Sequence, residues 1–363
     1  MDKKRIYLDL HVLQTVPPSC LNRDDTGSPK TAVYGGVTRA RVSSQSWKKA
    51  MRDHFVEHYE TDNRGHRTLR VVKLISDMIS EKDPAAKNTM KLAENIINFA
   101  GLKTKFDKDE DEAKMQALFF ISDKQAKSLA EIVLENPKIC NSRKAADKNL
   151  VIEALNKNPA IDIALFGRMA ADEIKLTTDA CAQVAHVIST HSVNNEYDYF
   201  TAVDDLSAQF DAGAGHLGTI EYNSATLYRY STLAVHNLME HLEEETKSAV
   251  LEFVKAFILS LPTGKQNTFA AQTLPDAVLV TLRNDRPINF VGAFEVPIKA
   301  RDEGNVILSK KALVKHIKNI ESDFLSPPVQ AYTVGEGLEE VGTRYRLDEM
   351  LNQLESDLTR LLK

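Results

Sequence analysis

The chain has 363 residues, 43% of them hydrophobic, and its 51 Asp and Glu outnumber its 46 Lys and Arg, for a formal net charge of −5. This length exceeds the usual size of one compact core, so we expect two or three lobes or one domain with large insertions. The apolar stretch 249–261 is interrupted by Glu252 and Lys255 and is too short to cross a bilayer, and Asp9 and His11 interrupt any export signal. These features exclude a membrane-spanning or exported protein and predict a cytoplasmic one.

The first predicted element is a strand over residues 6–13. Apolar residues alternate with more polar ones there, which is the pattern of a strand with one buried face. The apolar set is Ile6, Leu8, Leu10 and Val12. Residues 14–34 are rich in Pro, Asn, Asp and Gly and are predicted to form a long loop. Loops of this length are usually functional or disordered.

The stretch from Thr26 to Arg52 concentrates positive charge, with six Lys or Arg and no Asp or Glu. The six are Lys30, Arg39, Arg41, Lys48, Lys49 and Arg52. A helix is predicted to begin near Ser44, where serines can cap it and backbone amides point outwards. Its inward stripe at helical spacing is Trp47, Met51, Phe55 and His58. Together these features predict a cradle for phosphates, and the alternative is a solvated basic helix face.

Residues 60–172 have the texture of a helical insertion. They are rich in Lys, Glu, Ala and Leu at helical spacing, most clearly over 69–79, 90–99 and 126–134. The charge run 107–112 is expected to be a solvated loop.

Residues 177–191 are predicted to form a strongly apolar helix, after which the pattern changes to strands. Aromatic and apolar residues over 197–206 lead into the small-residue segment 212–218, and residues 219–230 then alternate like a strand. This is the pattern of a hairpin with a small-residue tip. Arms of about ten residues at about 3.3 Å per residue would project on the order of 30 Å, enough to reach a neighbouring molecule.

The last third is predicted to contain a helix over 247–261, a loop over 262–268, a strand over 277–282 and an amphipathic helix over 347–362. Combined with the earlier elements, the order is strand, helix, strand, strand, helix, strand. This order is that of the split βαβ or RRM-like plan, so the predicted fold class is α+β.

Two glycine-containing segments lack the features of nucleotide sites. Gly264 and Lys265 do not form the phosphate loop of a nucleotide hydrolase. That loop needs a glycine where Leu259 stands and a serine or threonine where Gln266 stands. The three glycines within 213–218 do not open a helix after a strand, as dinucleotide binding requires, and are better explained as a flexible hairpin tip.

The histidines and cysteines do not form a recognisable metal site. His186 and His191 are five residues apart on a predicted helix, too far offset to share a metal, and are expected to be core histidines with satisfied hydrogen bonds. Cys20, Cys140 and Cys181 include no Cys-x-x-Cys pair and are expected to be free thiols. We therefore expect no metal and no cofactor.

Two pairs of adjacent acids are candidates for a catalytic or magnesium site. The pairs 24–25 and 204–205, all aspartates, could hold magnesium or abstract a proton from a ribose 2′-hydroxyl. Adjacent carboxylates also simply make turns and helix caps. The aromatic RNP motif of an RRM is absent, so we expect contacts to the nucleic-acid backbone rather than bases stacked on a sheet.

Several ordered motifs resemble those of the CasC family, the backbone subunit of the type I-E Cascade CRISPR surveillance complex. The motifs are His11-Val-Leu13, Pro18-Ser-Cys-Leu-Asn-Arg-Asp-Asp25, Val42-Ser-Ser-Gln-Ser46, Gly167-Arg-Met-Ala170, Phe200-Thr-Ala-Val-Asp-Asp-Leu206 and His216-Leu-Gly-Thr219. The resemblance runs through most of the chain. Apart from Gly167-Arg-Met-Ala170 near its end, the helical insertion contains no matching motif, and the carboxyl-terminal third matches only around 264–271.

The resemblance implies a hand-like fold with a modified RRM or ferredoxin-like palm, helical fingers and a β-hairpin thumb. Its boundaries here are palm at 1–58 and 223–363, fingers at 59–176, a palm helix at 177–195 and a thumb at 196–222. It also implies a non-catalytic subunit that polymerises along CRISPR RNA and presents the guide to target DNA. The implied partners are crRNA, neighbouring copies and other Cascade subunits, with no membrane.

The resemblance also implies roles for individual residues. Those implied to bind RNA are Arg23, Arg41, Ser43, Ser44, Gln45, Lys48, Lys49, Arg52 and Gln266. Those implied to act in the thumb and at a kink in the guide are Met169, His216, Leu217 and Gly218. From the residues alone, core packing is an equal alternative for Met169.

Two other functions remain open at this point. Related backbone subunits of other CRISPR types cleave target RNA with a loop aspartate, so a metal-dependent ribonuclease using Asp24 or Asp25 is one alternative. The other is a generic single-strand-binding module, which would cover no fixed number of nucleotides per subunit.

Overall fold

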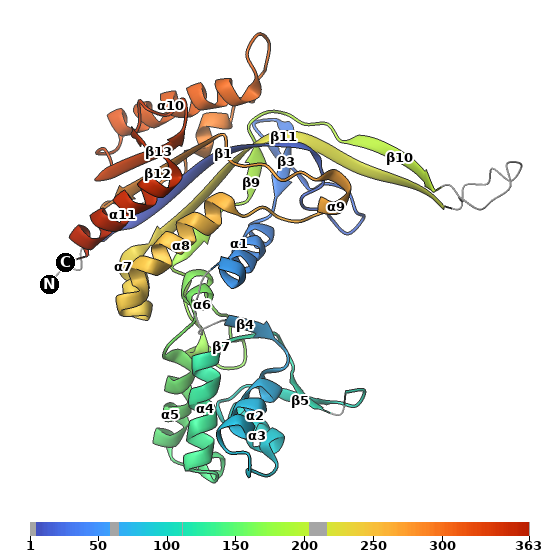
Figure 1. Cartoon of the computed structure of the whole chain (residues 1–363), viewed down its shortest axis with the longest axis vertical. Helices are drawn as coiled ribbons and strands as arrows, with labels where there is room; N and C mark the ends of the chain where they lie inside the picture. Colours follow the sequence, from blue (N-terminus) through green and yellow to red (C-terminus); the bar gives the residue numbers. More distant parts are fainter. Residues whose placement is uncertain (1–4, 59–64, 111, 203–215, 363) are drawn as a thin grey trace, which may run out of the picture. The chain divides into compact units, whose positions relative to one another are not determined.

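A computed structural model describes residues 5–58, 65–110, 112–202 and 216–362. The chain divides into two compact units, coloured by sequence in Figure 1. We call them the sheet unit (1–57, 184–233 and 250–363) and the helical unit (58–183 and 234–249). Among the described residues, no helix has the length and apolarity needed to cross a bilayer.

The sheet unit is built on one large sheet in the order β14-β13-β12-β1-β11-β9-β3-β2 (Figure 1). These strands are β1 (Tyr7–Ser19), β2 (Thr31–Tyr34), β3 (Val37–Val42), β9 (Val187–Ser189), β11 (His216–Ala234), β12 (Ala277–Arg283), β13 (Gln330–Gly335) and β14 (Thr343–Arg344). β1 and β12 pair antiparallel, as do β12 and β13, whereas β13 and β14 pair parallel. The sheet is therefore mixed.

Helices complete the sheet unit and confirm the predicted α+β class. They are α1 (Ser44–His58), α8 (Thr246–Leu259), α9 (Gln266–Phe269), the short η4 (Phe290–Phe294), α10 (Asn305–Asp323) and α11 (Leu347–Leu361). The predicted order of strand, helix, strand, strand, helix and strand corresponds to β1, α1, β10 (Glu196–Ala202), β11, α8 and β12, and the structure adds β2, β3, β8 (Ala182–Val184) and β9 as further strands of the same sheet. The sequence analysis did not predict β2, β3, α10 or the 13-residue length of β1, which extends into the expected loop.

The sheet is covered on both faces, so the prediction that β1 has only one buried face is wrong. Asp9 and His11, on the side expected to face solvent, are fully buried. Nδ1 of His11 lies 2.8 Å from the hydroxyl of Tyr228, and the Tyr230 hydroxyl donates to Asp9 Oδ1 at 3.1 Å. These tyrosines of β11 belong to a core with η4 and α10, and that second apolar layer is why β1 lacks a solvated face.

On the opposite face, Arg229 of β11 is fully buried between the aromatic rings of two helices. Its guanidinium carbon lies 3.8 Å from the ring centroid of Trp47 in α1 and 4.7 Å from that of Phe257 in α8. The cation and the two rings attract one another strongly because no water intervenes. Arg229 therefore fixes α1 against the sheet.

The predicted apolar helix over 177–191, and with it the palm helix over 177–195, is wrong. This segment forms β8 (Ala182–Val184) and β9 (Val187–Ser189), and β9 pairs with both β3 and β11. The apolar residues Val184, Val187 and Ile188 are β-branched and pack well on a pleated sheet. Strand pairing with distant residues therefore decided the conformation.

The predicted hairpin is present as β10 (Glu196–Ala202) paired antiparallel with β11, and the two strands run out together from the sheet (Figure 1). Phe200 stands opposite Gly218, and a Cβ at Gly218 would lie 2.3 Å from the Phe200 ring. The Phe200 ring therefore packs directly over Gly218, and a larger residue there would displace the ring. His216, Leu217 and Gly218 already lie in the strand and not at the tip, and residues 203–215 lie outside the described part of the chain.

The helical unit contains the three predicted helices and several unpredicted elements. Its helices are α2 (Val71–Lys82), α3 (Thr89–Phe99), α4 (Asp123–Glu135), α5 (Ala145–Asn156), α6 (Ile161–Phe166), α7 (Val235–Leu242) and the short η1 (Ile139–Asn141), η2 (Ile174–Leu176) and η3 (Glu243–Glu245). Two small antiparallel pairs were not predicted: β4 (Gly65–Thr68) with β7 (Phe119–Ser122), and β5 (Thr104–Asp107) with β6 (Glu112–Met115). Apolar side chains of α2 to α5 form one core.

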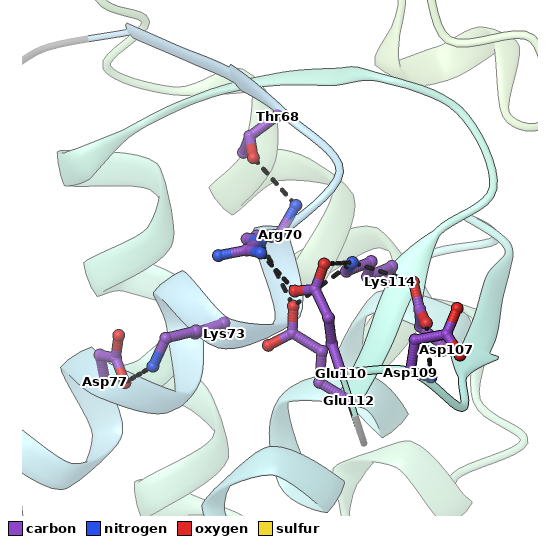
Figure 2. A network of polar contacts seen from close by, with 9 residues as sticks. All are labelled: Thr68, Arg70, Lys73, Asp77, Asp107, Asp109, Glu110, Glu112 and Lys114. Carbon is purple, nitrogen blue, oxygen red and sulfur yellow. Dashed lines mark hydrogen bonds and ion pairs between the residues drawn. The ribbon is translucent and has the colours of Figure 1, made fainter.

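The charge run 107–112 contains an exposed turn over residues 108–110, as predicted, and its acids also form ion pairs. Figure 2 shows its acids gathered around two cations. Lys114 Nζ lies 2.9 Å from Asp107 Oδ2 and 2.6 Å from Glu110 Oε1. Arg70 pairs with Glu110 and with Glu112, the latter at 3.4 Å. Arg70 precedes α2, so its pairs with Glu110 and Glu112 tie the β5–β6 hairpin to the start of α2, whereas Lys114 joins acids within the hairpin.

Candidate nucleic-acid interface

α1 begins at Ser44, as predicted, and Ser43 just before it caps the helix. Ser43 is buried, and its Oγ accepts from the backbone N–H of Ser46 at 3.3 Å. The Ser43 N–H donates in turn to Asn22 Oδ1 at 2.9 Å. The N–H groups of Ser44 and Gln45 belong to the first turn, which offers anions the positive end of the helix dipole. The Ser43 hydroxyl thus builds the cap, whereas the first-turn amides are the groups suited to a phosphate.

The loop before α1 is an ordered turn. The Asn22 carbonyl accepts from Lys30 N at 2.9 Å. Asp24 Oδ1 accepts from the Thr26 hydroxyl at 2.7 Å, from Thr26 N at 2.9 Å and from Ser28 N at 3.1 Å. These bonds, the Thr26 hydroxyl first, lower the pKa of Asp24 and make it a weaker base.

Asp24 therefore matches the turn alternative better than the catalytic one. Asp25, beside it, is exposed. Asp204 and Asp205 lie outside the described residues. Across the ranges that the structure describes, no group of three or more His, Cys, Asp or Glu side chains is arranged to hold a metal.

A groove of about 250 Å³ lies between this loop, α1 and the segment that follows α8. Its lining residues are Leu21, Asn22, Arg23, Ser46, Lys49, Ala50, Asp53, Pro262, Thr263 and Gly264. Gly264 makes the groove possible, since a Cβ there would lie 2.3 Å from the Leu21 carbonyl oxygen. The structure thus brings together Arg23 and Lys49, which are 26 residues apart in the sequence.

Lys49 pairs with Asp53, which lies one residue beyond the acid-free stretch from Thr26 to Arg52. Its Nζ lies 2.6 Å from both carboxylate oxygens of Asp53. The Lys49 and Asp53 side chains are 68% and 50% exposed, so the pair is weak and a phosphate can compete for Lys49. The i,i+4 spacing is the sequence signal that could have revealed this pair.

The remaining cations of α1 differ in their surroundings. Lys48 is half-buried, and burial lowers the pKa of its ammonium group. Arg52 is also half-buried, one turn further along the helix. As predicted, Trp47, Met51 and Phe55 form the buried stripe, but His58 is exposed. The residue buried in its place is His54.

Arg39 does not belong to the basic surface, contrary to its inclusion in the predicted cluster. It is fully buried, and its guanidinium donates to the carbonyls of Tyr34, Ser189 and Phe294 at 2.8–3.1 Å. Arg39 therefore joins β3 to β9 and η4. Nothing in an alternating strand pattern distinguishes it from Arg41, two residues away.

Two other predicted contact residues are partly engaged within the protein. Arg41 donates through Nε to the Thr31 carbonyl at 3.2 Å, which holds its side chain along β2. Gln266, with its amide oriented so that Oε1 accepts, bonds the backbone N–H groups of Ala271 and Gln272 at 3.1 and 3.2 Å. Gln266 thus closes the turn after α9, and any contact to RNA would involve its remaining donors.

Met169 is displayed on the surface of the helical unit. It is 82% exposed, so the core-packing alternative is wrong. Gly167 before it has φ +79°, a conformation that favours glycine. Arg168 is buried and donates to the carbonyls of Leu176 and Leu155 at 2.8 and 2.9 Å. Gly167 and Arg168 therefore hold the backbone that presents Met169, a role that the sequence analysis did not assign.

For the predicted hairpin residues, the structure describes the strand pairing of His216 and Leu217 but not their side chains. His216 and Leu217 pair with Ala202 and Thr201 in the β10–β11 ladder, and their side chains lie outside what is described. The cysteines agree with the sequence analysis, since Cys20, Cys140 and Cys181 are all free.

Comparisons with known proteins identify the family. A model of CRISPR-associated proteins described as "CT1975-like protein" matches residues 8–357. This chain belongs to the CT1975-like protein family. A search of curated proteins found no match. The family agrees with the motifs shared with CasC proteins.

Two solved structures resemble the chain over nearly its whole length. One is a chain described as "CRISPR RNA-guided surveillance complex, pre-nicking", with a TM-score of 0.83 and 31% identity, covering 96% of this chain and 100% of that one. The other, "CRISPR RNA-guided surveillance complex", has a TM-score of 0.71 and 26% identity, covering 96% and 99% of the two chains. The α+β fold is thus shared with subunits of such complexes.

Proposed function

We propose that this CT1975-like protein is a non-catalytic, RNA-binding backbone subunit of a type I-E CRISPR surveillance complex. Copies of it polymerise along the crRNA and present the guide for pairing with target DNA in antiviral defence. The observation that carries the proposal is the groove beside α1, where Arg23 and Lys49 adjoin the capped start of a helix. The similarity to chains of RNA-guided surveillance complexes supports it.

The chemistry of the groove suits a guide of any sequence. Ammonium and guanidinium groups and first-turn amides recognise phosphate oxygens, which are the same in every nucleotide. A protein that holds only the backbone leaves the Watson–Crick edges free for the target strand. In this proposal Arg23, Lys48, Lys49 and Arg52 contact phosphates, with Arg41, Ser43, Ser44, Gln45 and Gln266 along the same path.

The remaining parts of the chain are assigned by the same proposal. The palm comprises 1–58 and 223–363, the fingers 59–176 and the thumb 196–222. Met169 and Leu217 wedge beside a displaced base, with His216 and Gly218 next to Leu217. The exposure of Met169 supports this role, because a wedge must reach the nucleic acid. The partners are crRNA, neighbouring copies and the other subunits of a cytoplasmic complex.

Native mass spectrometry of the protein mixed with a CRISPR RNA tests the proposal directly. We expect several protomers on each RNA, with the RNA intact. A single protomer with shortened RNA would overturn the scaffold function and favour a nuclease, and Asp25→Ala would then be the first variant to test. If the number of nucleotides covered by each protomer varies, the protein is instead a generic single-strand-binding module.

A charge reversal tests whether α1 carries the contact. Lys48→Glu with Arg52→Glu should abolish retention of RNA while circular dichroism stays that of the folded protein. The matched control is Lys311→Glu with Lys315→Glu on α10, which has the same spacing and the same change in net charge. Equal RNA retention by the two double variants would exclude α1 as the contact.

A further inference from the structure

Three side chains that can carry positive charge gather where β3 meets β9. Arg41 of β3 stands opposite Ile188 of β9, and His186 lies in the short connection between β8 and β9. Arg41 Nη1 lies 3.2 Å from Nδ1 of His186. The backbone N–H of Arg41 donates to the Lys30 carbonyl at 2.9 Å, which brings Lys30 to the same place. His186 is exposed, so the prediction that it is a core histidine is wrong.

By contrast, His191 has the satisfied bonds expected of a core histidine. Its Nε2 accepts from Thr226 N at 3.0 Å, and its Nδ1 lies 2.9 Å from the Ser192 carbonyl oxygen. The two histidines of this short segment therefore have different roles. His191 joins strands, whereas His186 extends the charged surface of Arg41.

The groups around His186 are cationic or neutral. From the side of β2 and β3 the charges that act on it are those of Arg41 and Lys30. On the side of β11, Tyr228 pairs with Ile188 and the Tyr230 carbonyl accepts from the backbone N–H of Ala185, and the hydroxyls of these two tyrosines are engaged with His11 and Asp9. Among the described residues, no carboxylate contributes to the charge at His186. Burial first, then Arg41 and Lys30, lower its pKa from the usual 6.5.

This arrangement is suited to an anion. A guanidinium can approach Nδ1 only as a donor, so the unprotonated ring nitrogen faces Arg41 and the proton sits on Nε2. An anion placed against Arg41 and His186 removes the repulsion between two cations, and it favours the doubly protonated ring. A phosphodiester fits because it stays ionised throughout the range in which histidine titrates.

The position is continuous with the groove beside α1. Asn22 lines that groove, and it also lines a small depression together with Lys30 and Arg41. The Asn22 carbonyl accepts from Lys30 N, and its side chain accepts from Ser43 N. One residue therefore links the two places, which favours successive phosphates of one strand over a free phosphate ion.

We propose that Lys30, Arg41 and His186 form a further phosphate-binding position for RNA, and that the His186 ring takes up a proton from solvent when RNA binds there. This inference rests on the proposed function. RNA affinity then rises as pH falls, by up to about tenfold for each unit by which RNA raises the histidine pKa. At low pH the added cation steepens the dependence of log affinity on log salt by about 0.7.

Fluorescence anisotropy with labelled, mixed-sequence single-stranded RNA tests the proposal between about pH 5.5 and about pH 8. The proteins are the full-length wild type, His186→Gln and, as control, His241→Gln in the helical unit. Glutamine can accept from Arg41 but cannot gain a charge. We expect the affinity of the wild type and the control to rise at low pH, and that of His186→Gln to change much less.

The outcomes separate this inference from the proposed function. Tight RNA binding with the same pH profile in wild type and His186→Gln would overturn the role of His186 and leave the function standing. No RNA binding by the wild type at any pH would contradict the function and the inference together. A third outcome concerns the pKa of His186 measured by NMR. If inorganic phosphate and RNA shift this pKa equally at equal phosphate concentration, the position is a site for free phosphate and not for RNA.

Discussion

Replacing Asp53 with Asn tests whether Lys49 is a phosphate contact held in check by its neighbour. The Lys49–Asp53 pair is exposed, and an exposed i,i+4 pair contributes about 0.3–0.5 kcal/mol. A phosphate at the groove must displace this pair, and it also meets the charge of Asp53, which costs about 0.5 kcal/mol at about 8 Å in water. Removing the carboxylate should therefore improve RNA binding by about 1 kcal/mol, or about fivefold.

The assay is RNA affinity of the full-length protein at low salt, together with its unfolding midpoint in urea. The control is Asp77→Asn, which breaks the i,i+4 pair with Lys73 in the helical unit and changes the net charge equally. We expect Asp77→Asn to leave affinity unchanged, because Asp77 is not among the residues that line the groove. Unchanged or weaker binding by a folded Asp53→Asn protein would refute a phosphate site at Lys49.

Three further predictions concern salt, the groove wall and the buried acid of β1. About six cations per protomer, Arg23, Lys30, Arg41, Lys48, Lys49 and Arg52, should make log affinity fall with log salt at a slope near −4, and a slope near zero would rule out phosphate contacts. Gly264→Ala should destabilise the fold by about 1–3 kcal/mol and weaken RNA binding, because its Cβ would lie 2.3 Å from the Leu21 carbonyl oxygen. Gly304→Ala, where nothing lies within 4 Å, is the control, and equal behaviour of the two variants would contradict the close approach. Burial raises the pKa of Asp9 to about 6 from 3.8, so the proton held there stabilises the fold fully below the lower value, and that stabilisation is lost as pH rises through the higher one. Urea midpoints across this range should fall for the wild type but not for Asp9→Asn, and parallel curves would exclude Asp9 as the cause.

Local patterns in the sequence were sufficient for elements whose own residues supply most of their stability. α1 carries a capping serine, apolar residues three or four apart and cations on the remaining face, so its start and inner stripe were predictable. The same holds for α2, α3 and α4, whose helical spacing repeats over several turns. The spacing misplaced only His58 at the end of α1, where a helix frays and packing ceases.

Short strands were not predictable, because their conformation depends on distant partners. β9 has three residues, and its identity as a strand comes from pairing with β3 and β11. Apolar residues in so short a segment are compatible with a helix or a strand. The burial of Asp9 and His11 likewise depends on tyrosines more than 200 positions away.

The sequence alone established that positive charge is concentrated before and within α1 and that the motifs resemble those of a CRISPR backbone family, since both are linear features of the chain. Only the tertiary structure decided which charges can act. It buried Arg39 among carbonyls and placed His186 against Arg41, 145 residues away. Burial and pairing set the availability of a charge, and both depend on which segments the fold brings together.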